Sequence, residues 1–314
     1  MANPDQARKT GRLFELRALG CLILAGTCLA LSLIVAKLAD SAGAPRLTFL
    51  MSAMAGAGVI LAALSMLRNQ VMRPNPRVLE YALVAGVLLA LPNALGFLAV
   101  RHVGAGFVTL SFAFPILLTW VLAVLLGLER LGIPRLTGVL LALAGGVVLA
   151  GARAGTGDGD ALWVALIVGI PLLIALGNIY RTLRWPTGAA PVFLAAVMML
   201  GAALALLPFA LALESEQVGA LIGSATVATL LLAEIAVFTV LYLFYFVLQR
   251  LAGPVYLSQI GIVAAIIGTV IAVLALNEPT PPNLGMAAVL IIAGTVLFHQ
   301  RSGAPAGARA PRRD

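Results

Sequence analysis

The chain has 314 residues, of which 62% are hydrophobic and only 10% are charged, and its mean hydropathy is +1.08. Soluble domains carry about 25% charged residues, so this composition excludes a soluble globular protein. The formal net charge of +8 comes from basic residues in short segments between apolar runs, where it reports on membrane topology and does not indicate nucleic-acid binding.

Long, continuous apolar runs predict an all-α integral membrane protein with ten transmembrane helices, because a β-barrel would show short alternating segments. Residues 1–17 are expected to form a cytoplasmic N-terminal tail, residues 152–160 an external linker and residues 300–314 a disordered cytoplasmic tail. The helices are expected at 18–38, 46–67, 79–100, 104–126, 133–151, 161–182, 191–213, 226–249, 254–276 and 283–299.

The distribution of basic residues predicts the orientation of these helices. Of the 20 Lys and Arg residues, only Lys37, Arg46, Arg101 and Arg153 fall on one side of the expected membrane. The other 16, among them Arg181, fall on the side of the two termini. By the positive-inside rule, both termini are expected in the cytoplasm.

An internal repeat relates the two halves of the chain, 18–151 and 161–299. An offset of 149 residues carries Arg101 onto Arg250 and Glu129 onto Glu278, and charged residues are too scarce here for such coincidences to be expected. Five helices per repeat is an odd number, so the second copy is expected to enter the membrane upside down. Inverted repeats place a substrate site near the midplane between the halves and permit alternating access.

The segment from Gly104 to Arg130, with Pro115 in its middle and "VLAVLLGLER" at its end, resembles the fourth helix of the drug/metabolite transporter superfamily, EamA type. The second copy, from Gly253 through "VIAVLALNEP", resembles the ninth helix of that family. This resemblance covers about residues 18–299 and implies a small-molecule carrier in the inner (plasma) membrane of a bacterium. Its size and aromatic eighth helix also resemble the bacterial aromatic amino acid exporters.

The segment 226–249 carries the most informative polar residue. Glu234 lies about 12 Å along this helix at a rise of 1.5 Å per residue, and an intramembrane carboxylate suggests function. Phe238, Tyr242, Tyr245 and Gln249 share its face. The alternative is an interfacial Glu that reaches the headgroups, with aromatic residues packed on neighbouring helices.

Further substrate-binding candidates come from the repeat offset and from polar residues inside apolar runs. Asn93 follows Pro92, so its amide either satisfies backbone groups freed by the proline or binds a ligand. At the end of 104–126, Glu129 and Arg130 fit an interfacial or local pair better than a direct substrate role. The remaining candidates are Phe107, Ser111, Trp163, Asn178, Tyr256 and Gln259.

These patterns together favour a secondary transporter, most simply an exporter of amino acids, aromatic or otherwise apolar, or of similar small metabolites. The alternatives are a carrier for another metabolite or drug class, or an integral membrane enzyme acting on a lipid-soluble substrate. The chain has two His residues and no phosphate-binding loop, so we expect neither an enzyme nor a cofactor, metal site or nucleic-acid partner. The expected partners are the small-molecule substrate and membrane lipids.

Overall fold

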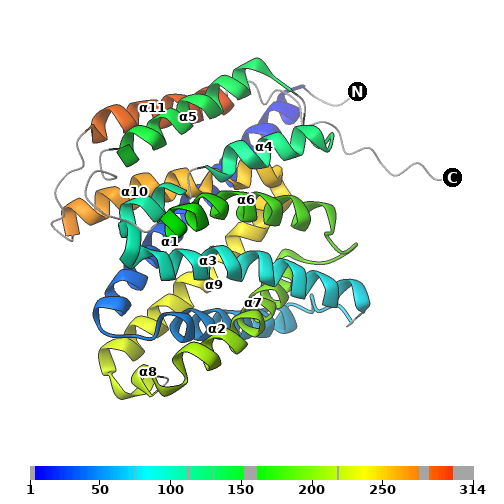
Figure 1. Cartoon of the computed structure of the whole chain (residues 1–314). Coiled ribbons are helices and arrows are strands. Elements are labelled where there is room, and N and C mark those ends of the chain that lie inside the picture. The colour runs from blue at the N-terminus through cyan, green and yellow to red at the C-terminus, as the bar shows by residue number, and fades with distance from the viewer. Residues whose placement is uncertain are drawn as a thin grey trace.

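In the computed structural model, residues 4–73, 75–111, 114–129, 131–151, 161–217, 219–275 and 283–299 are described. Every regular element in these ranges is helical (Figure 1). The elements are α1 (Pro4–Ser41), α2 (Arg46–Leu67), α3 (Pro76–Ser111), α4 (Pro115–Leu125), α5 (Ile133–Gly151), α6 (Ala161–Leu183), α7 (Pro191–Glu214), the 3₁₀ turn η2 (Ser215–Gln217), α8 (Ala220–Gly223), α9 (Ala225–Leu257), α10 (Ile260–Ala275) and α11 (Leu284–His299).

Five helical segments in the described ranges are long and apolar enough to cross a membrane. Shorter apolar helices accompany them at Pro115–Leu125, Ile133–Gly145 and Gly169–Leu183. The long spans are Phe14–Ser41, Arg46–Leu67, Pro76–Leu98, Pro191–Gln217 and Ala225–Leu257. The protein is therefore a multi-pass membrane protein whose described elements are all helical.

Three expected boundaries are wrong. α1 begins at Pro4, so residues 4–17 belong to the first helix, whose start was expected at residue 18. No loop occurs at 101–103, because α3 continues to Ser111, and α4 begins at Pro115, a residue suited to the first position of a helix. The expected loop at 250–253 is a kink inside α9, where Gly253 adopts φ 79°, a conformation that favours glycine.

The packing of the helices follows a paired pattern. α2 packs on α7 and α5 on α11, and the other extensive contacts come in couples: α1 with α9 and α6 with α3, α2 with α9 and α7 with α3, α1 with α10 and α6 with α4. This set of pairs is unchanged when each helix of the first half is exchanged for its counterpart in the second half, that is α1 for α6, α2 for α7, α3 for α9, α4 for α10 and α5 for α11. Figure 1 shows α5 and α11 side by side along one edge of the bundle.

Small residues permit the closest helix contacts. A Cβ built on Gly138 of α5 would lie 2.7 Å from the Gly294 carbonyl oxygen of α11, and one built on Gly294 would lie 2.5 Å from the Ala142 nitrogen. Gly138 and Ala142 of α5 therefore form a surface on which α11 packs closely, as expected for small residues four apart in membrane helices.

Candidate functional site

Glu234 lies inside the bundle on α9, with 0% of its surface exposed. Ser32 of α1 donates a hydrogen bond of 2.5 Å to Glu234 Oε1, while Oε2 has no hydrogen-bond partner. An interfacial carboxylate reaching for headgroups would be exposed, so that alternative does not describe Glu234. A carboxyl group at this position is expected either to have a cation beside it or to be protonated.

Aromatic rings continue from Glu234 along the same face of α9. Phe238 and Tyr242 make an edge contact with ring centroids 5.5 Å apart, and the Tyr242 and Tyr245 rings are 5.7 Å apart. Tyr242 is only 4% exposed, so this face points into the protein and not toward lipid. The face therefore carries a stack of rings that begins at a buried carboxylate.

At the far end of this stack, polar residues of α6 meet α9. The Tyr245 hydroxyl donates to Asn178 Oδ1 at 2.6 Å, and Gln249 Nε2 donates to the Asn178 carbonyl oxygen at 3.0 Å. Arg181 Nη2 donates to Asn178 Oδ1 at 2.7 Å and to the Tyr245 hydroxyl at 2.5 Å. Asn178 Nδ2 in turn lies 3.4 Å from Thr119 Oγ1 of α4. Asn178 thus joins α4, α6 and α9.

Asn93 and Gln259 take different positions. Asn93 Nδ2 donates to the Leu89 carbonyl oxygen at 2.8 Å, which agrees with backbone satisfaction beside Pro92, and its side chain also faces Tyr242. Gln259 was expected inside a helix but lies in the turn between α9 and α10. It is buried, and neither of its side-chain polar atoms has a hydrogen-bond partner.

Of the four other candidates, one lies away from this cluster and three have side chains outside the described part of the structure. Tyr256 belongs to the last turn of α9 and lies near Glu15 and Cys21 of α1. Phe107 and Ser111 belong to α3 and Trp163 to α6, but their side chains lie outside the described part of the structure.

Sequence reasoning missed three side chains that the fold brings to this face. Ser32 is one hydroxyl among many in apolar helices, and nothing in its neighbourhood links it to Glu234. Tyr81 of α3 is fully buried beside Tyr180, and its hydroxyl has no partner. The sequence places Arg181 among the basic residues on the side of the two termini, but its side chain is buried, with only 2% exposed. The one available signal was the Asn178–Arg181 spacing of three, which places both side chains on one helix face.

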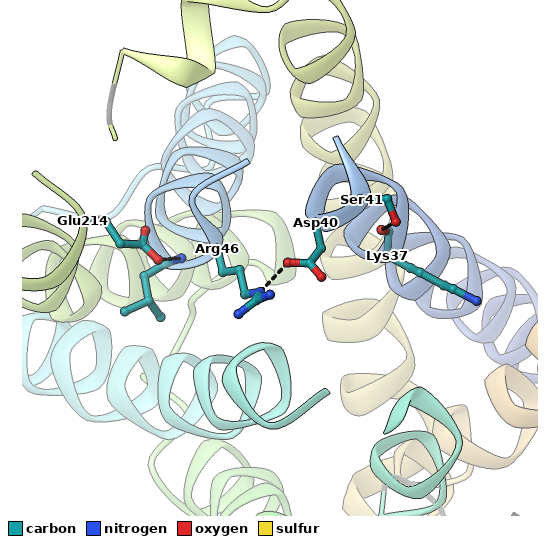
Figure 2. A network of polar contacts seen from close by, with 6 residues as sticks. Lys37, Asp40, Ser41, Arg46 and Glu214 are labelled. Carbon is teal, nitrogen blue, oxygen red and sulfur yellow. Dashed lines mark hydrogen bonds and ion pairs between the residues drawn. The ribbon is translucent and has the colours of Figure 1, made fainter. Parts of the chain in front are cut away.

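A second polar cluster lies where α1 and α7 end and α2 begins. Figure 2 shows the Glu214 carboxylate beside the start of α2, and Arg46 reaching toward Asp40. Glu214 accepts hydrogen bonds from the backbone nitrogens of Leu47 (3.1 Å) and Thr48 (2.8 Å) and from the Thr48 hydroxyl (2.9 Å). A cavity of about 520 Å³ lies beside these contacts and is lined in part by Asp40, Arg46, Leu47, Leu98, Glu214 and Gln217.

At the opposite end of the bundle, Glu129 forms an ion pair with Arg135, whose guanidinium lies over the ring of Phe298, 5.6 Å from its centroid. The local-pair interpretation of Glu129 is thus supported with a different partner, since Arg130 lies outside the described residues. Within the described ranges, no group of three or more His, Cys, Asp and Glu side chains could hold a metal ion.

Comparison with known proteins supports a transporter. A crystal structure titled only as that of a protein matches with a TM-score of 0.68 at 18% identity, over 89% of this chain and 98% of its own. This similarity shows a shared fold along most of the chain. No curated protein sequence matches. The family model described as "EamA-like transporter family" matches residues 16–151. Residues 16–151 are therefore similar to the EamA-like transporter family.

Proposed function

We propose that the protein is a secondary carrier of ten transmembrane helices that exports amino acids or similar small metabolites by alternating access. The observation that carries this proposal is the paired packing of the helices, which is preserved when the two halves are exchanged. Such packing is expected of two inverted repeats, here 18–151 and 161–299, related by a pseudo-twofold axis in the membrane plane.

The proposed substrate site is the α9 face from Glu234 to Tyr245, together with its neighbours. Ring faces there offer stacking surface to an apolar or aromatic side chain, and each good pair adds about 0.5–1.5 kcal/mol beyond burial. Glu234 either meets a cation on the substrate or carries a proton. The proposed site includes Asn93, Phe107, Ser111, Trp163, Asn178, Glu234, Phe238, Tyr242, Tyr245, Tyr256 and Gln259.

We place the protein in the inner (plasma) membrane of a bacterium with both termini cytoplasmic, since most Lys and Arg residues fall on that side. The cluster of Asp40, Arg46 and Glu214 then lies at the external end. In an alternating-access cycle its cavity would serve as the outer vestibule of the carrier.

Vesicles reconstituted with the purified protein test this function. They are loaded with a panel of labelled amino acids, and efflux is compared with that from protein-free vesicles. Saturable efflux of at least one amino acid is expected. Chemical conversion of a lipid-soluble compound without net movement of any solute would favour the membrane-enzyme alternative, and movement of other metabolites alone would exclude amino acids as the cargo.

A further inference from the structure

Arg181 departs from the usual behaviour of an arginine near a helix end. It lies in the last turn of α6, where such a side chain normally extends outward to the membrane interface. Instead, its guanidinium folds back over the preceding turn: a Cβ built on Gly177 would lie 3.0 Å from Arg181 Nη1. Arg184, three residues later, is the internal comparison, because its side chain is 66% exposed and its Nε lies 4.0 Å from Glu80.

The buried guanidinium has only neutral neighbours among the described side chains. No carboxylate in the described ranges lies within ion-pair distance of Arg181. Its oxygen acceptors are Asn178 and Tyr245, both bound by Nη2. Nη1 reaches only the sulfur of Met198, at 3.9 Å, and Nε has no partner.

Stabilisation of this charge is therefore incomplete. The Tyr245 ring adds a cation–π contact, with the guanidinium carbon 5.2 Å from the ring centroid. The carbonyl groups at the C-terminus of α6 would favour a cation, but the side chain points away from them. Burial removes water from the guanidinium, and without an anion nearby no interaction of equal strength replaces that hydration. A negative group is therefore the missing partner.

We propose that Arg181 is the receptor for the carboxylate group of the transported molecule, an inference that rests on the proposed carrier function. A planar guanidinium matches the two oxygens of a carboxylate better than any other side chain does. The hydroxyl of Tyr81, which is buried without a partner and close to Arg181, supplies a further donor. Gln249 Oε1, also buried and unpaired, lies on the same face of α9 and can accept a hydrogen bond from a donor group of the bound molecule.

The position of Glu234 separates its role from that of Arg181. Tyr245, which holds Arg181, lies 11 residues after Glu234 on α9, which corresponds to about 16 Å of helix rise. One carbon separates the ammonium and carboxylate groups of an α-amino acid. A single amino acid therefore does not bind Glu234 through its ammonium group while Arg181 holds its carboxylate.

Thermal unfolding of the purified full-length protein in detergent tests this assignment. The probes are acetate and 3-phenylpropionate, each compared with its uncharged amide at equal ionic strength, and L-phenylalanine, compared with L-phenylalaninamide, which keeps the amino group but lacks the carboxylate. At least one carboxylate is expected to raise Tm by several degrees more than its amide. R181Q is expected to abolish this difference, and R184Q, which removes an exposed charge just after the end of α6, is expected to keep it.

R181K keeps the proposal testable if R181Q does not fold, because lysine retains the charge but loses the planar fork. We expect R181K to weaken carboxylate binding about tenfold. Three outcomes would overturn the assignment: equal stabilisation by acid and amide, no stabilisation by any carboxylate, or a shift that persists in R181Q. Tighter binding of phenyl phosphate than of 3-phenylpropionate would also overturn the choice of a carboxylate.

Failure of the carrier function would look different. If carboxylates bind through Arg181 but cross no vesicle membrane, the anion site stands and the transport proposal fails. If the vesicles transport only solutes that lack a carboxylate, the carrier stands and the anion site fails.

Discussion

The guanidinium of Arg181 rests directly over Gly177, one helical turn earlier, where the absence of a Cβ leaves the space that the side chain occupies. A larger residue at position 177 would therefore displace the guanidinium and keep its charge.

We expect G177A to displace the guanidinium by a few tenths of an ångström and so to distort its bonds with Asn178 and Tyr245. Hydrogen bonds to charged groups contribute about 1.5–3 kcal/mol when intact, so their distortion should weaken carboxylate binding by about two- to tenfold. Titration of Tm against 3-phenylpropionate measures the loss. G169A is the matched control, because a Cβ built there meets nothing within 4 Å. Equal weakening in both variants would show that helix stiffness, and not the position of Arg181, is responsible.

Replacement of Glu234 by Gln removes the charge and keeps the shape. If Glu234 carries a proton during the cycle, E234Q abolishes the dependence of efflux on a pH gradient and retains exchange of labelled for unlabelled substrate at equal pH, which is the result we expect. Both are measured in the same vesicles, with E80Q at an exposed position as the control. Loss of exchange together with gradient-driven efflux would instead indicate that Glu234 binds the substrate.

Tyr242 tests the aromatic part of the site. Y242A is expected to reduce transport per folded molecule about two- to tenfold through loss of ring contacts. Because Tyr242 is buried, the same change costs about 3–5 kcal/mol of stability, so the folded fraction must be measured alongside transport. V240A, at a 37% exposed position two residues away, should leave transport unchanged. Unimpaired transport by Y242A would remove the ring from the site.

Glu214 tests the external end of the bundle. E214A removes the acceptor for two backbone N–H groups at the start of α2, and loss of such a cap costs about 1–2 kcal/mol. Thermal unfolding should show the loss, while E216A, at an exposed position two residues away, should not. An unchanged Tm in E214A would mean that these bonds contribute no net stability.

Topology is tested by single introduced cysteines in intact cells. An impermeant maleimide is expected to label E216C and to leave R73C unmodified. The native Cys21 and Cys28 are buried and should contribute little background. Labelling of R73C would reverse the assignment of the cytoplasmic side.

Much of the helical framework is predictable from sequence because apolar runs between charged or Pro/Gly breaks mark membrane helices. The expected ranges 46–67 and 133–151 coincide with α2 and α5. Between 79 and 126, the break was placed near Gly104, but glycine only lowers helix preference. The helix instead ends shortly before Pro115, which cannot continue the hydrogen-bond ladder.

The candidate site was predictable only along one helix. The face of α9 follows from 100° steps, so Glu234, Phe238, Tyr242 and Tyr245 could be grouped in advance. The direction of Arg181 could not, because it depends on Gly177 and on Tyr245, which lies in another helix. An arginine in the last turn of a helix can extend outward or turn inward, and its position in the sequence is the same in both cases.

The Glu214 cap has a consequence for how the chain is made. The N-terminus of α2 receives its acceptor from a residue synthesised long after α2 has left the ribosome. Until α7 is inserted, the backbone N–H groups of Leu47 and Thr48 lack this partner and depend on water or headgroups. The matched family domain ends at residue 151, so a five-helix fragment of that length would leave the start of α2 incomplete. In such a fragment these N–H groups would stay bonded to water or headgroups unless a second chain supplied the acceptor.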